Sequence, residues 1–151
     1  VTMALPEAIG VLAQIAPEEN PLITTVSLIA PAIAMGNRVV LIASERYASI
    51  ALELVQTLET SDIPAGVVNI LTGNKTELAE QLAGHAEVDG IWCWAEPEIV
   101  SQVEAISAID LKRLWVHIDG DRDWLDSRQG EGLEFLRNAT EVKNIWTPYG
   151  D

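Results

Sequence analysis

The sequence predicts a doubly wound α/β domain: a mainly parallel, five-stranded sheet with helices on both faces, plus a C-terminal strand. Two patterns predict this fold class. Short apolar segments alternate along the chain with segments whose apolar residues recur at helical spacing. Hydrophobic residues make up 48% of the 151 residues, enough for one domain with a sizeable core. Alternating strands and helices favour right-handed crossovers and therefore parallel strands.

The first half of the chain supplies three predicted strands, residues 9–15, 38–43 and 67–71. The first helix begins at Pro21, which suits a first helical turn, and ends at Gly36-Asn37. We expect a kink at Pro31, because proline cannot donate a helical hydrogen bond. A second helix is predicted at about residues 47–60. The apolar faces of the two helices are set by Leu22, Val26, Ile29, Ile33, Ile50, Leu54, Val55 and Leu58.

The second half continues the alternation with predicted strands at 91–94 and 114–118. A helix is predicted before each of these strands, because apolar residues recur there at helical spacing. The first helix ends near residue 84 and contains Leu78, Ala79 and Leu82. The second begins at Pro97 and contains Ile99, Val103 and Ile106. The polar stretch 119–130 interrupts this rhythm and is interpreted as a solvated linker. A short helix is expected at 131–138 and a last strand at 141–147.

Charge and composition exclude several function classes. The chain has 9 basic and 23 acidic residues, a net charge of −14, which argues against binding to nucleic acid or to anionic membranes. No apolar run approaches the roughly 20 residues that span a bilayer, and no signal peptide is recognisable. The single cysteine, Cys93, fits a reducing compartment, so we expect a cytoplasmic protein. Because the chain begins with Val1, it is interpreted as a processed or excised piece.

No metal site or reactive thiol is predicted. Cys93 is interpreted as a buried hydrophobe, because no neighbouring cation would lower its pKa. His85, His117 and this cysteine do not have zinc-site spacing. The acidic run 119–123 fails the calcium-loop signature, which requires a glycine at its sixth position and a glutamate at its twelfth. Three tryptophans on predicted strands are expected in the core or in an interface: Trp92, Trp94 and Trp115.

Five segments together resemble a known family. Residues 29–42 (IAPAIAMGNRVVLI) and 63–73 (IPAGVVNILTG) resemble the cofactor-binding domain of NAD(P)-dependent aldehyde dehydrogenases. Residues 85–91 and 111–118 resemble the stretches that follow in that domain, and 139–146 resemble the C-terminal strand by which family members pair subunits. The resemblance implies a Rossmann-like domain at 1–118, a linker at 119–130 in place of the catalytic domain, and a short helix with an oligomerisation strand at 131–151.

The departures from this family fall on its working residues. Ile42 stands where the family has a lysine for the cofactor, whereas Glu45, a ribose ligand in many members, remains as a vestigial cofactor-binding residue. Glu96 replaces a serine that approaches the pyrophosphate, and its carboxylate at a helix N-terminus would repel a phosphate. Glu19 aligns with the oxyanion-hole asparagine and cannot donate a hydrogen bond. His117 aligns with the general base.

The resemblance therefore implies a fold without the family's chemistry. The nucleophile belongs to the missing catalytic domain, and Cys93 does not match it, so no catalytic residue and no cofactor is predicted. We expect a non-catalytic, aldehyde-dehydrogenase-like domain with a structural or oligomerisation role in a larger aldehyde dehydrogenase. Its partner would be a second copy or an active aldehyde dehydrogenase domain, and its interface residues Val142, Ile145 and Trp146.

Two alternatives remain open at this stage. The chain could belong to a functional NAD(P)-dependent enzyme that oxidises aldehydes to carboxylic acids, with Glu45 and helix N-termini holding the cofactor. It could also be a small-molecule sensor that uses the vacated cofactor crevice.

Overall fold

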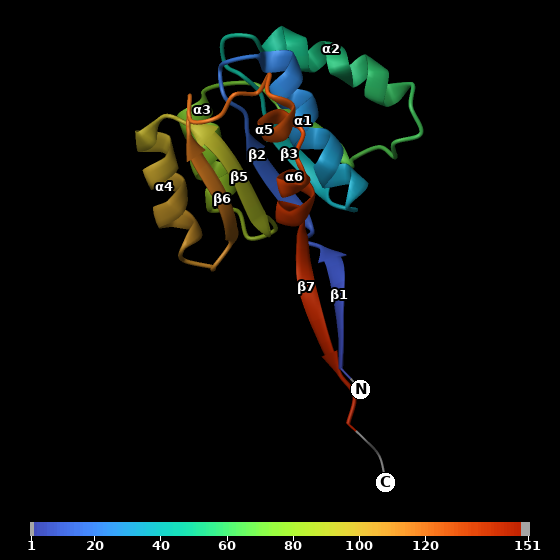
Figure 1. Cartoon of the computed structure of the whole chain (residues 1–151). Helices are drawn as coiled ribbons and strands as arrows, with labels where there is room; N and C mark the ends of the chain where they lie inside the picture. Colours follow the sequence, from blue (N-terminus) through green and yellow to red (C-terminus); the bar gives the residue numbers. More distant parts are fainter. Residues whose placement is uncertain (1, 149–151) are drawn as a thin grey trace.

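The computed structural model describes residues 2–148 as an α/β body from which a two-stranded arm projects (Figure 1). The body contains a parallel five-stranded sheet in the order β4-β3-β2-β5-β6. Its strands are β2 (Val11–Ile15), β3 (Arg38–Ile42), β4 (Val68–Leu71), β5 (Gly90–Ala95) and β6 (Arg113–Ile118). The predicted fold class is confirmed, and each of these strands overlaps a predicted one.

Four long helices cover the two faces of the sheet. One face packs against α1 (Pro21–Ala34) and α2 (Ala48–Glu59), in a cluster that includes Leu28, Leu12 and Leu41. The other face packs against α3 (Lys75–Ala83) and α4 (Pro97–Ser107), in a cluster that includes Ala79 and Val103. The strand order reverses between β2 and β5, so the connections leave these two strands in opposite directions. In open α/β sheets such a switch point creates a crevice at the carboxyl ends of the strands.

The helix α1 continues through Pro31, the position of the expected kink. The Met35 N–H donates to the Pro31 carbonyl at 3.2 Å, so the helix makes a further turn after the proline. Pro21 occupies the start of α1, as its sequence position predicts. The loop that follows the helix holds Asn37, whose side chain is buried.

Residues 119–139, whose first part the polar sequence predicts to be a solvated linker, include both exposed and buried side chains. They carry two short helices, α5 (Ser127–Gly130) and α6 (Leu133–Asn138), and they pack on the face of β5 and β6 beside α1. Trp124 is only 2% exposed. The reason is that the sheet presents Trp92, Trp94 and Trp115 on this face, where α1 and α2 do not reach. The domain boundaries at 118 and 130 remain a prediction.

These aromatic side chains form one cluster around an arginine. The Arg122 guanidinium lies 5.2–5.8 Å from the ring centroids of Trp94, Trp115, Trp124 and Phe135. The same guanidinium hydrogen-bonds to the carboxylate of Glu134 at 2.9 Å. Cation–π contacts of this kind strengthen when the cation is removed from water. The cluster therefore attaches the segment 119–139 to the sheet.

The arm pairs the two ends of the described chain. Strand β1 (Thr2–Ala8) runs antiparallel to β7 (Thr140–Trp146), from Thr2 opposite Trp146 to Ala8 opposite Thr140. The predicted C-terminal strand is thus present, whereas β1 is a strand that the sequence pattern does not predict. Asn37 fixes the base of the arm: its amide donates to the Ala139 carbonyl at 2.8 Å, and its side-chain oxygen accepts from the Gly10 N–H at 3.0 Å.

Among the helices of the described residues, none has the length and apolar character needed to cross a membrane.

Candidate functional site

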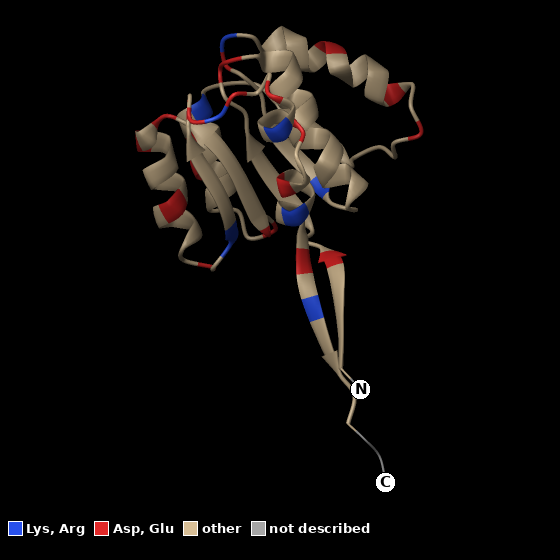
Figure 2. Ribbon diagram, in the orientation of Figure 1, with Lys and Arg blue, Asp and Glu red and all other residues tan. Residues whose placement is uncertain are grey.

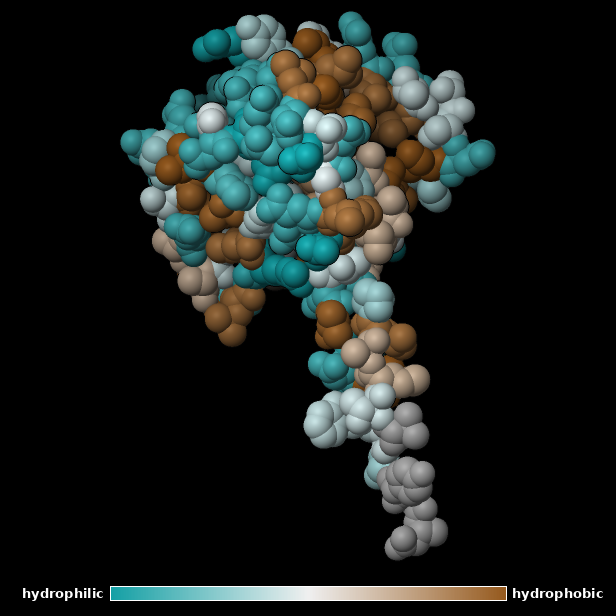
Figure 3. All heavy atoms as spheres, in the orientation of Figure 1, coloured by the Kyte–Doolittle hydropathy of each residue, from teal (hydrophilic) through white to brown (hydrophobic). Residues whose placement is uncertain are grey.

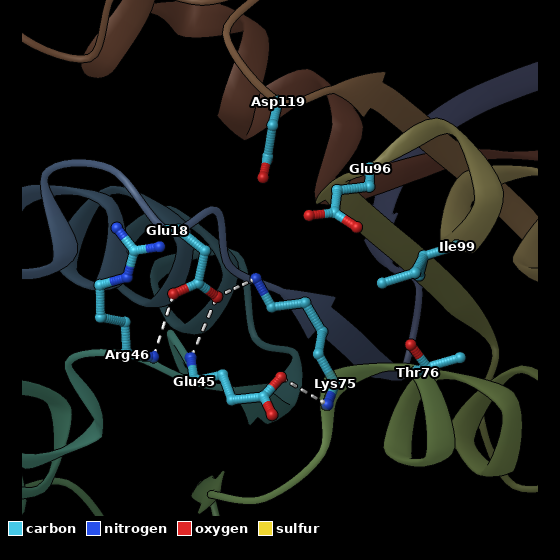
Figure 4. Close-up of a pocket in the computed structure, with 8 residues that line it drawn as sticks. All are labelled: Glu18, Glu45, Arg46, Lys75, Thr76, Glu96, Ile99 and Asp119. Atoms are coloured by element: carbon cyan, nitrogen blue, oxygen red, sulfur yellow. Dashed lines mark hydrogen bonds and ion pairs between the residues drawn. The ribbon is translucent and has the colours of Figure 1, made fainter.

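The crevice lies at the carboxyl ends of the strands, where the strand order reverses. Its cavity of about 440 Å³ is shown in Figure 4. Residues from the ends of β2, β3 and β6 and from the first turns of α3 and α4 converge on it. The lining residues are Glu18, Glu45, Arg46, Lys75, Thr76, Glu96, Ile99 and Asp119.

Glu18 occupies the centre of a hydrogen-bond network at the end of β3. Its carboxylate accepts from the backbone N–H groups of Glu45 at 3.0 Å and Arg46 at 3.1 Å. It also accepts from the Ser44 hydroxyl at 2.7 Å. The ion pair that it forms with the Lys75 ammonium is drawn in Figure 4. Two backbone donors, a hydroxyl and a cation are a donor set suited to an anion. In this chain, that anion is the protein's own carboxylate.

These partners determine the protonation of Glu18. Burial alone would raise the pKa of this carboxyl group, but the Lys75 ion pair and the bonds from Ser44 and the backbone outweigh it. Together they lower the pKa to about 2. Glu18 is therefore an anion at every physiological pH. The cation of this ion pair, Lys75, is 5% exposed.

Glu45 lies in the crevice, but it has a structural partner there. Its carboxylate accepts a hydrogen bond from the backbone N–H of Lys75 at 3.2 Å, at the first turn of α3. Ile42, which stands in place of the family's lysine, is fully buried among the side chains under α3 and α4. The side chain thus points away from the crevice and into the core.

Two further carboxylates face the cavity. Glu96 is the N-cap residue of α4, as expected, and makes no side-chain capping bond within the described part of the chain. Burial raises the pKa of Asp119, and the nearby carboxylates of Glu18, Glu19 and Glu96 raise it further, against an opposing effect of Lys75. One oxygen of Asp119 is buried and finds no hydrogen-bond partner among residues 2–148.

This arrangement is a poor fit for a dinucleotide. The cavity lining contains four carboxyl groups and two cationic side chains, and one of the cations is already paired with Glu18. A pyrophosphate at the N-terminus of α4 would lie close to the negative charge of Glu96, whose carboxylate makes no capping bond within residues 2–148. The backbone N–H groups of the turn after β3 already donate to Glu18. Repulsion and the loss of the Glu18 bonds would both oppose its binding.

The other residues that the sequence singled out, Cys93, His117 and Glu19, do not line the crevice. Cys93 is fully buried under α3 and α4, and burial raises the pKa of its thiol to about 12, as its interpretation as a buried hydrophobe predicts. His117 stacks on Trp94 at 5.4 Å, on the other face of the sheet. Burial, followed by the charge of Arg122, lowers the pKa of His117. Glu19 is exposed at the turn before α1.

Sequence reasoning missed the residues that organise the crevice. Glu18, Ser44, Lys75 and Asp119 were not selected as site residues, although each follows a strand by only a few positions. That position was an available signal, because parallel strands deliver the residues after their carboxyl ends to one crevice. Their mutual contacts could not be read in advance, since they join residues that are 26 to 57 positions apart in the chain.

The comparisons with known proteins agree with this architecture. The model of the aldehyde dehydrogenase family matches residues 1–125. The chain belongs to the aldehyde dehydrogenase family. A hydroxyisobutyraldehyde dehydrogenase from Mycolicibacterium austroafricanum is 31% identical over 120 residues, which are 80% of this chain and 24% of that protein. The NADP/NAD-dependent aldehyde dehydrogenase PuuC from Escherichia coli is 31% identical over 121 residues, 80% of this chain and 24% of that protein.

Solved aldehyde dehydrogenases share the fold. The structure of aldehyde dehydrogenase C from Pseudomonas syringae, a mutant bound to NAD+ and octanal, superposes with a TM-score of 0.75 at 30% identity. The match covers 82% of this chain and 27% of that one. An indole-3-acetaldehyde dehydrogenase in complex with NAD+ gives 0.74 at 31% identity, covering 78% and 24%. This member of the aldehyde dehydrogenase family thus spans about a quarter of the length of its curated relatives.

Proposed function

We propose that this chain is a non-catalytic aldehyde dehydrogenase domain whose role is structural, in the assembly of a larger aldehyde dehydrogenase. The observation that carries the proposal is the Glu18–Lys75 pair in the cofactor crevice. The carboxylate of Glu18 accepts hydrogen bonds from the backbone N–H groups at the end of β3. The ammonium of Lys75 is already paired with Glu18 and would have to leave it to bind a phosphate. The domain keeps the shape of a dinucleotide-binding fold and has internal contacts where the ligand would be.

The positions of Cys93 and Glu19 support the loss of chemistry. Cys93 is buried away from the crevice with a high thiol pKa, whereas a nucleophilic cysteine needs a lowered one. Glu19 offers acceptors only at the position of the oxyanion-hole donor. These features favour a domain that does not catalyse aldehyde oxidation by itself.

The arm supports the structural role. Two of its predicted interface residues, Val142 and Trp146, are 65% and 78% exposed. A two-stranded ribbon in water is marginally stable alone, and exposed apolar side chains on it are typical of a surface that packs against a partner. Figure 3 shows apolar side chains along the arm.

A second candidate function has one specific observation in its favour. Glu45, the vestigial ribose ligand, lines the crevice, and two of the solved relatives hold NAD+. If other segments supply the nucleophile, this domain would bind NAD(P) in a working aldehyde dehydrogenase.

The two candidates are distinguished by cofactor titration. NAD and NADP are added up to millimolar concentration while tryptophan fluorescence and heat are recorded, with an intact, active aldehyde dehydrogenase as the positive control. We expect no saturable response from this chain. Saturable binding below about a millimolar would support the second candidate and reject the first.

The structural role is tested by light scattering and by mixing with an active aldehyde dehydrogenase domain. We expect an oligomer, or a complex with that domain. A clean monomer that binds no aldehyde dehydrogenase domain would overturn the assembly role.

A further inference from the structure

A groove lies between the helix α2 and the edge strand β4. Its volume is about 520 Å³, and its apolar lining includes Val55 and Leu58 from the helix and Val68 and Ile70 from the strand. Among the 12 residues of α2, Ala51 is the one that is buried. The helix and the strand therefore face each other across a groove and are not closely packed together.

The outer edge of β4 carries backbone groups that can pair with a further strand. The Val39 N–H donates to the Val67 carbonyl at 2.8 Å, and Leu71 accepts from β3 in the same way at 3.0 Å. Alternate residues of a parallel strand direct their backbone groups to the same side, so Val68 and Ile70 direct theirs away from β3. Within residues 2–148, no strand pairs with that side of β4.

The groove and the strand edge together fit an extended peptide segment. When a peptide adds a strand to the edge of a sheet, main-chain hydrogen bonds supply affinity and pockets for alternate side chains supply specificity. Here the outward backbone groups and the apolar strand side of the groove belong to the same two residues, Val68 and Ile70. A helix in the groove would fill the apolar space but would leave those backbone groups without a protein partner. The arrangement therefore favours a strand.

The charge around the groove is of one sign. Residues 47–74, which include α2, the loop after it and β4, contain three acidic residues and no basic one (Figure 2). Glu59 lines the groove, Glu53 lies on the same helix, and Asp62 precedes the lining residue Ile63. A second copy of this chain, with its net charge of −14, would be repelled here. A basic segment has the complementary charge.

We propose that β4 and the groove bind an extended, basic segment of a partner protein. The segment adds a sixth strand beside β4 and places alternate apolar side chains in the groove. Lysine or arginine residues that flank its apolar part lie close to Glu53, Glu59 and Asp62. This surface belongs to the body and does not depend on the arm, so it gives the domain a contact beyond the proposed structural role.

Three labelled peptides test the chemistry of the partner. KKVTVTVKK has alternating apolar side chains and basic flanks, KKTVVVTKK has the same composition without the alternation, and EEVTVTVEE has the opposite charge. Fluorescence anisotropy at low salt measures their binding to the whole chain. We expect saturable binding of KKVTVTVKK, at least tenfold tighter than that of either control. Equal binding of the two basic peptides would show charge attraction alone and would overturn the proposal.

Methylation of the peptide backbone tests strand pairing. Methyl groups on alternate peptide nitrogens remove the donors from one edge of a strand and leave the other edge intact. One form of KKVTVTVKK is methylated at its valines, and the matched control is methylated at its threonines. We expect one form to bind at least tenfold more weakly than the other, because only one edge of the peptide faces β4. Similar affinities for both forms would exclude strand addition.

Charge reversal tests the location of the site. Glu59→Lys, in the groove lining, should weaken the binding of KKVTVTVKK by about fivefold or more. The matched control is Glu80→Lys, at an exposed position of α3 on the other face of the sheet, which gives the same net charge and should change binding by less than about twofold. Far-UV circular dichroism verifies that both variants are folded. Equal effects of the two variants would place binding elsewhere and overturn the proposal.

Sedimentation of the chain alone tests a second copy as the occupant. If the chain dimerises and KKVTVTVKK dissociates the dimer, the groove belongs to a second copy, and the basic partner is overturned. The proposal expects that the peptide leaves the oligomeric state unchanged. The absence of saturable KKVTVTVKK binding would also overturn the proposal, while the structural role, which is tested by light scattering and mixing, would stand.

Discussion

Glu18 determines the electrostatics of the crevice at the scale of single residues. Its carboxylate receives hydrogen bonds from both backbone N–H groups of the turn after β3 and from Ser44, and it neutralises a nearly buried lysine. The turn from β3 to α2 and the start of α3 are thereby linked to the end of β2. One side chain both stabilises this edge of the sheet and occupies a binding position.

We expect Glu18→Gln to lower the free energy of unfolding by about 1–3 kcal/mol, because the amide leaves Lys75 buried without a counter-charge and one of its two head-group atoms cannot accept a hydrogen bond. Urea unfolding at neutral pH measures the loss. Glu53→Gln, an exposed carboxyl group on α2, is the matched control and should change stability by less than about 0.5 kcal/mol.

The same residue gives a pH dependence. The pKa of Glu18 falls from 4.5 to about 2 on folding, so its stabilising effect is complete above pH 4.5 and is lost as the pH falls from 4.5 towards 2. The stability difference between the native chain and Glu18→Gln should therefore narrow over this interval. A difference that stays constant down to pH 2.5 would contradict the lowered pKa.

At the scale of elements, the segment 119–139 covers part of one face of the sheet, as a helix layer would. The crossovers between β2 and β4 place α1 and α2 over one half of a sheet face, and the crossovers to β5 and β6 place α3 and α4 on the other face. The other half of the first face carries the tryptophan side chains of β5 and β6, which require another segment to bury them. Trp124 and Phe135 supply it with little regular structure, and Arg122 is held among the rings.

Trp124→Ala should destabilise the fold by about 3–5 kcal/mol, the usual cost of removing a large buried aromatic side chain. The adjacent Leu125 is 70% exposed, so Leu125→Ala should change stability by less than about 0.5 kcal/mol. Urea unfolding of the two variants decides whether the segment is part of the core. Similar, small effects for both would restore the interpretation of 119–130 as a solvated linker.

At the scale of the whole molecule, the aromatic cluster joins segments that the sequence divides. Trp92 and Trp115 come from the predicted domain 1–118, Trp124 from the predicted linker, and Phe135 from the predicted C-terminal unit. The body is thus held together across both predicted boundaries. The arm is the exception, because its contacts to the body are concentrated at its base around Asn37.

We therefore expect the body to unfold in one cooperative step. Tryptophan fluorescence, which reports mainly on the aromatic cluster, and far-UV circular dichroism, which reports on the helices, should give coincident urea transitions. A fluorescence transition at clearly lower urea than the loss of helix would mean that residues 119–139 detach first, as a separate unit.

Local patterns determined most of the body. The apolar run 39–42 and the helical spacing of Leu22, Val26 and Ile29 fixed a strand and a helix, because hydrophobic periodicity and proline and glycine positions are properties of neighbouring residues. The resemblance to the aldehyde dehydrogenases likewise lay in contiguous segments. These local signals also placed Ile42 and Glu96 at positions where the family binds its cofactor.

Only the tertiary structure decided what depends on distant residues. Strand β1 is unrecognisable by itself, since Thr2–Ala8 contains a proline, and it forms because β7 returns beside it after more than 130 residues. The burial of Trp124 depends on an uncovered half of the sheet, and the role of Glu18 depends on donors brought from β3 and α3. The sequence determined the helices and strands and the residues at which this chain departs from the family. Long-range packing determined which charges meet in the crevice and which strand pairs with β7 in the arm.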